Sequence, residues 1–445
     1  MILSGVIIAQ TSIKIYNQGW ALVQEERQKK FSQTGEQTLL IPKLPPTIDP
    51  SSINLFSEEI SFLSKEYIFH PVSIKSLLDS NVGSEVELVK YGEDGSITFS
   101  TIGKLLNNVN VPIFEIDGKI VINPPYNYRF SHIPDNINNY PYLNCLVNSL
   151  SISTDYYLTY FTHGIEWEAE FNLYLISDAK TAIEGWYSIR NDNNFSYDDV
   201  DVALVSGDIN FGRGNHTYQT NILKSSSMAR IGDNQSMQPE SDEIGDYFLF
   251  HIPEKINLPA KSQIRNKFLN KEKLSYNNVY HMSHSLSSYR RNISAQTTKI
   301  PVYIRMELYA SDFGNFQIPG GQYKVYEKDE NELTYIGAAS HGIAAGMDVI
   351  KLEIGKTHDI LCTFTVQEYK IDKNRGEAQV DVIIDNRKNK SVIVKWIEHF
   401  SNGNWEITTS KQKHVKLDAY RAEFTVEVPA NSKKEVSIFA KMEKD

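Results

Sequence analysis

The amino-acid sequence predicts an all-β fold: antiparallel β-sandwich modules with a small SH3-like barrel inserted near the N-terminus. Apolar and polar residues alternate with a period of two along most of the 445 residues, as they do in strands with one buried face. No apolar stripe with helical spacing extends beyond about ten residues. Aromatic residues make up 11% of the chain, and their side chains favour the pleated surface of a sheet.

Residues 1–81 are predicted to form an N-terminal β segment that pairs with the later sandwich. Alternating residues flank the turn Tyr16-Asn17-Gln18-Gly19, which predicts a hairpin because Asn and Gly tolerate positive φ. A further strand is expected at 38–41, before prolines between 42 and 50 interrupt regular pairing. Residues 70–80 are the best candidate for a short helix or turn.

Residues 82–131 are predicted to be the inserted small β-barrel. Turns at Gly92–Gly95 and Asp117-Gly118 separate short strands within about fifty residues, which is typical of an SH3-sized barrel. The expected strands are 85–91, 95–101, 104–106, 113–116 and 119–122.

Two larger β regions follow, a β-sandwich at 132–245 and a C-terminal β-sandwich region at 246–445. The first contains a long polar loop at 211–245, where Gly, Asn, Ser, Gln and Asp dominate. No exact internal repeat is visible, although related sandwiches without sequence symmetry remain an open alternative. Strands are expected at 146–153, 155–161, 167–176, 180–190 and 200–206, then at 247–251, 302–309, 321–327, 333–338, 349–353, 361–371, 378–386, 391–400, 405–409, 421–428 and 433–441.

Charge and hydropathy exclude two classes of partner. The net charge is −10, and no basic stripe of the kind that binds nucleic acid is present. No window of 18 consecutive apolar residues exists, so no integral membrane helix is predicted.

Gly-x-Ser-x-Gly, phosphate-binding Gly-rich loops, His-Glu-x-x-His and Cys-x-x-Cys are all absent. The sequence therefore favours a non-enzymatic protein, with no cofactor and no catalytic, cofactor-binding or metal residues.

The N-terminus and the two cysteines each admit two interpretations. Met1–Ala9 is either a signal-peptide remnant, which favours export to the cell envelope, or a first strand, which favours the cytoplasm. Cys145 and Cys362 lie in apolar contexts and are interpreted as buried small hydrophobes. A disulfide between them remains open, because spacing says nothing about its geometry.

Several polar clusters contain residue types that could form sites, but their sequence contexts favour structural roles. Closely spaced carboxylates follow Asp192 and can bind Ca²⁺, but they lack the EF-hand glycine and terminal Glu, which favours a solvated strand entry. Two histidines can share a helix face at i, i+3 but have no third ligand nearby. Alternating glutamates are expected on a solvated strand face, and the tryptophans in the core. These residues are Asp198, Asp199 and Asp201; His281 and His284; Glu166, Glu168 and Glu170; and Trp167, Trp186, Trp396 and Trp405.

A set of short segments, ordered along nearly the whole chain, forms a recognisable pattern. The first is Ile15–Val23 (IYNQGWALV), followed by Glu26-Arg27. The others are Ile48–Ser52, Gly83–Val89, Asn123–Pro125, Tyr160–Trp167, Gly185-Trp186, Leu204–Asn210, Pro319–Tyr326, Ile336-Gly337, Trp396–His399 and Asn404–Ile407.

This ordered set resembles an uncharacterised bacterial and archaeal family, a domain of unknown function that also forms the C-terminal part of mucoidy inhibitor A-like proteins. The resemblance implies no catalytic residues. Many members of the family are exported, and the mucoidy label implies a link to the envelope or its polysaccharide. This chain departs from the family at His163, where relatives often carry the first Gly of a Gly-Gly turn; His adopts the left-handed conformation less readily than Gly.

The sequence is compatible with three functions. The favoured one is a non-enzymatic β-rich binding or structural module of the cell envelope or surface, which contacts a protein or a glycan. The first alternative is a carbohydrate-active or other hydrolase, which would show two carboxylates about 5–10 Å apart across an aromatic-lined cleft. The second is an intracellular structural protein, if Met1 is the true start and Ile7 and Ile8 pair into a sheet. No oligomeric state is predicted.

Overall fold

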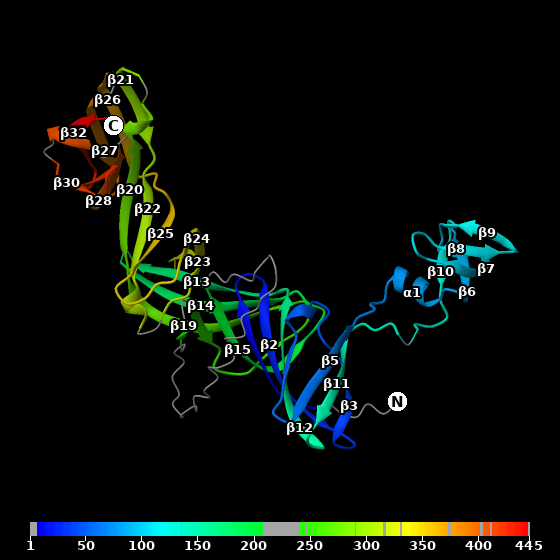
Figure 1. Ribbon diagram of the computed structural model, residues 1–445. Helices are drawn as coiled ribbons and strands as arrows, with labels where there is room; N and C mark the ends of the chain where they lie inside the picture. Colours follow the sequence, from blue (N-terminus) through cyan, green and yellow to red (C-terminus); the bar gives the residue numbers. More distant parts are fainter. Residues whose placement is uncertain are drawn as a thin grey trace. The chain divides into compact units, whose positions relative to one another are not determined.

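Strands make up 68% of the residues that the structure describes and helices 4%, which confirms the predicted all-β fold (Figure 1). The chain divides into two compact units: Met1–Trp167, Ile189–Ile231 and Asp242–Ile264 form unit 1, and Glu168–Ser188, Gly232–Ser241 and Arg265–Asp445 form unit 2. A computed structural model describes residues 7–134, 136–177, 179–207, 241–244, 247–289, 291–314, 317–329, 332–372, 375–400, 404–409 and 412–443.

Unit 1 contains a large sheet with the strand order β16-β17-β15-β1-β2-β12-β4, in which β18 also pairs with β15. β1 runs antiparallel to β2, with Ile15 opposite Ala21, so the predicted hairpin is confirmed and Gly19 has a φ of +80°. On its other side β1 runs parallel to β15. The bounds are β1 Ile7–Tyr16, β2 Trp20–Lys30, β4 Asn54–Phe56, β12 Ser153–His163, β15 Tyr197–Ser206, β16 Ser241–Ile244, β17 Tyr247–His251 and β18 Ile256–Leu258.

A smaller sheet of unit 1 has the order β3-β11-β5. It consists of β3 (Gly35–Ile41), β11 (Tyr142–Ser149) and β5 (Ile60–Ile68), and the 3₁₀ turn η1 (Pro50–Ser52) precedes β4. Most of the predicted polar loop at 211–245 lies outside the described residues, and its described part, 241–244, is β16.

The insertion forms a five-stranded sheet with the order β10-β6-β7-β8-β9 and a short helix, α1. In the described residues β9 and β10 are not paired with each other, so hydrogen bonds do not close the sheet into a barrel. The insertion has its own small core of Leu78, Val86, Leu88, Leu105 and Phe114. The bounds are α1 Ile74–Ser80, β6 Glu85–Tyr91, β7 Ile97–Asn107, β8 Ile113–Ile116, β9 Lys119–Ile122 and β10 Asn127–Arg129.

The strands of unit 2 lie in three sheets. Their strand orders are β19-β14-β13-β23-β24, β25-β22-β20-β28-β31-β30 and β21-β26-β27-β32-β29. The last two sheets share a large apolar core that includes Trp396, Phe364 and Phe424. The bounds are β13 Ile165–Ser177, β14 Lys180–Asn191, β19 Ser262–Ser275, β20 Asn277–Ser285, β21 Ile293–Ile300, β22 Tyr303–Tyr309, β23 Gly321–Asp329, β24 Glu332–His341, β25 Val349–Lys356, β26 Ile360–Asp372, β27 Arg375–Asn386, β28 Val392–His399, β29 Asn404–Thr409, β30 His414–Lys416, β31 Arg421–Val428 and β32 Ser432–Glu443, with 3₁₀ turns η3 Leu286–Ser288 and η4 Ala310–Phe313.

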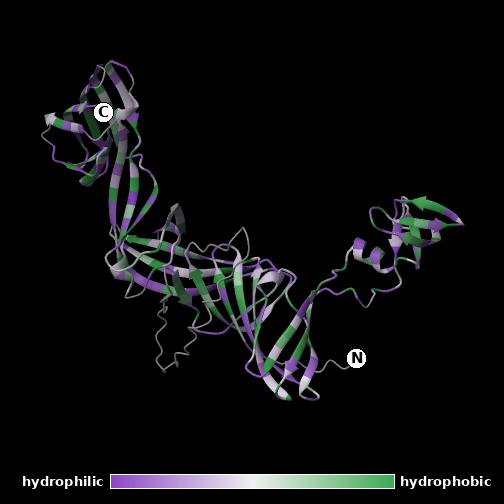
Figure 2. Cartoon of the chain, in the orientation of Figure 1, coloured by the Kyte–Doolittle hydropathy of each residue, from purple (hydrophilic) through white to green (hydrophobic). Residues whose placement is uncertain are grey.

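Hydrophilic and hydrophobic residues alternate along many strands (Figure 2), as the sequence predicts. On β28 Val392, Val394, Trp396 and Glu398 are buried, and the residues between them are exposed or half-buried. Two predicted strands, 95–101 and 104–106, are one strand, β7. Gly103, the glycine between them, lies within β7. A Cβ at this position would come within 2.9 Å of the Leu88 side chain, so a residue without a side chain fits here.

Two buried asparagines, Asn191 and Asn386, make the same set of contacts at two places in the chain. Nδ2 of Asn191 lies 2.9–3.2 Å from the carbonyl oxygens of Phe195, Leu258 and Pro259. Nδ2 of Asn386 lies 2.9–3.1 Å from those of Lys390, Val428 and Pro429. In both cases Oδ1 accepts a hydrogen bond from the backbone N–H two residues later. We call these two arrangements the asparagine clamps.

The segments around the asparagine clamps also match. Leu-Pro-Ala-Lys-Ser at 258–262 corresponds to Val-Pro-Ala-Asn-Ser at 428–432, and the fourth residue of each has a positive φ, 54° at Lys261 and 50° at Asn431. The strand after each clamp, β15 or β28, has a parallel partner, β1 or β20. The structure therefore contains a repeated supersecondary element that no exact sequence repeat announces.

Replacing Asn386 by Ala should destabilise the protein by about 1–3 kcal/mol, because buried carbonyl groups lose their donor. Asn191→Ala should have a similar effect. The free energy of unfolding in urea measures both. Asn389→Ala and Asn194→Ala are matched controls, since these asparagines are exposed in the same two turns. Equal stability of the Asn386 and Asn389 variants would contradict this role.

Candidate functional site

The acidic cluster after Asp192 is a solvated strand entry, as its sequence suggests. Asp198 and Asp199 are exposed, and Asp199 lies 3.5 Å from Nζ of Lys255. Asp201 accepts a hydrogen bond from Nε2 of Gln10. Among the described residues, no group of three or more His, Cys, Asp or Glu side chains is placed to hold a metal ion.

His281 and His284 lie on strand β20, so the expectation that they share a helix face is wrong. Residues three apart on a strand point to opposite faces. Nε2 of His281 lies 3.0 Å from Glu353, and burial lowers the pKa of His281. His284 contacts Glu398 instead. Each histidine therefore has its own carboxylate partner.

Two of the three alternating glutamates of β13, Glu166 and Glu170, are paired with cations, and Glu168 is exposed. Arg190 binds both Glu166 and Asp192, and its Nε lies 3.1 Å from Asp192. Glu170 pairs with Arg265 at 2.7 Å. Glu166 and Asp192 are thus two nearby carboxylates, and one guanidinium binds both. This arrangement does not resemble a general acid and a general base placed on either side of a substrate.

The tryptophans divide into two groups. Trp167 and Trp396 are in the core, as predicted. Trp186 and Trp405 are half-buried and carry cations over their rings: Arg265 and Lys267 lie 5.0 and 4.6 Å from the Trp186 ring, and Lys416 lies 4.7 Å from Trp405.

A buried carboxylate in unit 2, Glu398, collects three hydrogen-bond donors. It accepts from the backbone N–H of Leu286 at 2.7 Å and from Nε1 of Trp396 at 3.1 Å. Nδ1 of His284 lies 3.0 Å from both of its oxygens. Glu398 lies two residues after Trp396 on β28, so the strand alternation puts both on the buried face. A carboxylate at a position where this alternation requires an apolar residue is the sequence signal for the cluster.

The Glu398 cluster has the composition of a catalytic relay but not its activation. Nε2 of His284 lies 3.3 Å from the hydroxyl of Tyr289, which completes a series of carboxylate, imidazole and hydroxyl. However, burial and the nearby Glu398 raise the pKa of Tyr289, which keeps its hydroxyl protonated. The His284 ring also stacks on Phe364, at 3.6 Å between centroids. The cluster therefore joins β20 to β28 through buried hydrogen bonds.

A second buried ionic cluster, in unit 1, was not predicted. Glu25 and Arg27 are 4% and 2% exposed and bind each other on β2. The hydroxyl of Tyr160 donates to Glu25 at 2.9 Å. These residues continue the buried phase that Ala21 and Val23 begin. Because both side chains are buried, they are not accessible to a ligand.

Three segments of the family resemblance meet at one end of the large sheet of unit 1. His163 lies opposite Trp20 in the β2–β12 pair, and their ring centroids are 3.6 Å apart. Nε1 of Trp167 donates to the carbonyl of Val205. Gly164, with a φ of +76°, takes the left-handed position of the turn, and His163 does not have a positive φ. The departure from a Gly-Gly turn is therefore accommodated without strain.

The largest concentration of exposed apolar side chains lies in the insertion. Twelve of the 33 exposed large apolar residues in the described structure fall within residues 74–133, far more than this length of chain accounts for. Ile102, Ile120 and Ile122 are 54%, 71% and 65% exposed. Ile122 lies opposite Ile113. These four isoleucines share the sheet face opposite the core residues Leu105 and Phe114, and we call them the insertion face.

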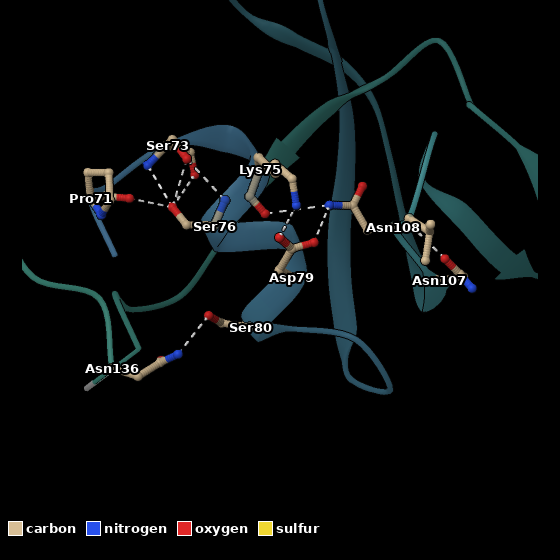
Figure 3. Close-up of polar contacts among 10 residues, drawn as sticks. Pro71, Ser73, Lys75, Ser76, Asp79, Ser80, Asn107, Asn108 and Asn136 are labelled. Atoms are coloured by element: carbon tan, nitrogen blue, oxygen red, sulfur yellow. Dashed lines mark hydrogen bonds and ion pairs between the residues drawn. The ribbon is translucent and has the colours of Figure 1, made fainter. Parts of the chain in front are cut away.

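Helix α1 is fixed to the insertion sheet by polar contacts (Figure 3). Ser73 and Ser76 form a capping box at its start. Asp79 binds Lys75 and accepts from Nδ2 of Asn108 at 2.8 Å, beyond the end of β7. These contacts lower the pKa of Asp79. The helix supplies Leu78 to the core, which leaves the insertion face on the opposite side of the sheet uncovered by α1.

No protein-family model matches this chain, and no curated protein matches it. The described residues contain no helix that is long and apolar enough to cross a membrane. The functional interpretation therefore depends on the surfaces themselves.

Both cysteines are free and buried, as the sequence analysis expected. Burial raises the pKa of Cys145 to about 11 and that of Cys362 to about 12, so little thiolate is present near neutral pH. In native protein at pH 8 both thiols should react with Ellman's reagent at least tenfold more slowly than in denaturant. Rapid reaction of either native thiol would contradict its burial.

Glu398→Gln should destabilise the protein by about 3 kcal/mol, because an amide cannot accept from all three donors and a buried imidazole loses its partner. Urea unfolding measures the change. Glu423→Gln is the control, since Glu423 lies on the neighbouring strand β31 at the half-buried face. An unchanged midpoint for Glu398→Gln would show that the cluster is not structural.

Proposed function

We propose that this protein is a non-enzymatic β-rich binding module of the cell envelope or surface, and that it holds a protein partner through the insertion face. One observation carries the proposal: three exposed isoleucines, Ile102, Ile120 and Ile122, and the half-buried Ile113 share one face of a sheet that has its own core. Monomeric proteins rarely expose such patches unless they are interaction sites. The envelope setting is supported by the resemblance to a family with many exported members.

The chemistry of the insertion face favours a protein over other partners. The isoleucines are branched and apolar and offer neither hydrogen bonds nor charge to a polar ligand. Lys104 lies between Glu85 and Glu115 in the strand register. The charged residues next to the isoleucines are therefore of opposite sign on neighbouring strands. β9 pairs with β8 alone in the described residues, so its other edge presents backbone donors and acceptors. An extended apolar segment fits such an edge, because it adds main-chain hydrogen bonds to side-chain contacts.

The hydrolase alternative has less support. The carboxylates that come together on the described surface, Glu166 and Asp192, are both bound by Arg190. An acid and a base for glycoside hydrolysis need different environments so that one is protonated and the other ionised. A shared guanidinium gives them the same environment.

The double variant Ile120→Thr/Ile122→Thr tests the proposal in the full-length protein. Thr keeps the β-branched shape but removes apolar contact, so capture of a cross-linked protein partner from envelope fractions should fall at least tenfold. The matched control is Ile383→Thr/Ile393→Thr, since these residues are 37% and 51% exposed on strands of unit 2.

Partner identity is read by mass spectrometry, and circular dichroism checks that each variant is folded. Loss of the same partner in both double variants, or in neither, would refute the role of the insertion face. Turnover of a glycan or peptide that is abolished by Glu166→Gln would instead support the hydrolase alternative.

A further inference from the structure

A row of three tyrosines crosses neighbouring strands of unit 2. Tyr174 on β13 lies beside Tyr326 on β23, which lies opposite Tyr335 on the edge strand β24. Their ring centroids are 5.7 and 5.6 Å apart. Exposure rises along the row: Tyr174 and Tyr326 are half-buried, and Tyr335 is 57% exposed. We call this set the tyrosine row.

Polar groups border the tyrosine row on the same face of the sheet. The hydroxyl of Tyr174 donates to Glu184 at 3.4 Å, and burial followed by Glu184 raises the pKa of this phenol, so it remains a donor. Glu184 also accepts from Lys267 at 2.6 Å. Two strand positions before Tyr326, Lys324 lies 3.5 Å from Glu170.

The charges beside the row are already paired. Glu184 has Lys267, and Glu170 has both Arg265 and Lys324. An ionic ligand would have to displace one of these partners, whereas a neutral ligand with many hydroxyls can add hydrogen bonds to them as they stand. The rings supply apolar area with a polar tip, which is the combination that amphipathic ligands require.

We propose that the tyrosine row binds a neutral glycan chain that runs across β13, β23 and β24. Sugar C–H groups would pack against the exposed ring of Tyr335 and against the outer edges of Tyr174 and Tyr326, whose rings stack on each other at an interplanar angle of 23°. Sugar hydroxyls would bond with the tyrosine hydroxyls and the paired side chains. A row that is long in one direction fits a linear chain better than a compact sugar. This site is separate from the insertion face and does not depend on the protein partner proposed for it.

Affinity electrophoresis of the full-length protein tests the glycan site. The native gels contain hydroxyethyl cellulose, laminarin or galactomannan as neutral probes, or polygalacturonate as the acidic probe. We expect at least one neutral polysaccharide to slow migration. Tyr335→Ala should weaken that binding about tenfold, and Tyr335→Phe, which keeps the ring, should retain most of it.

Tyr420→Ala is the matched control, because Tyr420 is 56% exposed in the same unit but lies outside the tyrosine row. It should migrate like the unmodified protein in every gel. Three results would overturn the proposal: no retardation in any neutral gel, retardation by polygalacturonate alone, or equal retardation of Tyr335→Ala and the unmodified protein. Thermal unfolding confirms that Tyr335→Ala is folded, which its exposed position on an edge strand favours.

Discussion

Buried carbonyl groups at the ends of strands must find hydrogen-bond donors, and in this protein two asparagine side chains supply them. A strand interior satisfies its backbone through its neighbours, but a chain that leaves one sheet for another exposes carbonyls inside the fold. Asn191 and Asn386 meet this demand with the same three-carbonyl geometry. Each fixes the turn from which the next strand, β15 or β28, enters a parallel pair. The same hydrogen-bond arrangement therefore occurs in both halves of the chain, although their sequences differ nearly everywhere else.

The sequence was most informative where a strand has one clear buried face. β6, β8 and β9 begin and end at the predicted residues, because turn residues bound a regular alternation there. β19 was not predicted, because Lys and Arg occupy many of its positions and only Leu269 and Leu274 are fully buried. No strand is predicted from the sequence at 277–285, where the two histidines at i, i+3 instead suggest a shared helix face. The alternation of these residues is irregular, and their strand character comes from pairing with β22 and β28, which no local pattern reveals.

Surfaces could not be predicted from the sequence, because register decides them. Tyr174, Tyr326 and Tyr335 are separated by long stretches of chain, and only the pairing of β13, β23 and β24 places them in one row. The same holds for Ile113 and Ile122 in the insertion, which lie opposite each other only through the register of β8 and β9. A buried charged residue is easier to locate, because its position in the strand alternation can be seen in the sequence. Glu25, Arg27 and Glu398 all occupy positions where the alternation requires an apolar residue. Sequence can thus locate interior polar clusters more readily than it can locate a contact surface.

The open edge of β9 has a consequence for the solution behaviour of the protein. Unsatisfied amides next to exposed isoleucines can serve as a template for a strand of another molecule, including an identical one, and growth from such edges leads to fibrils. Here the ladder is only four residues long, from Lys119 to Ile122, and it begins with a charged side chain. Brevity and charge limit self-templating while leaving room for a partner that brings additional contacts of its own. Pairing of another strand with the four residues of β9 alone is too small to hold two chains together. The edge therefore binds only a partner that makes further contacts elsewhere.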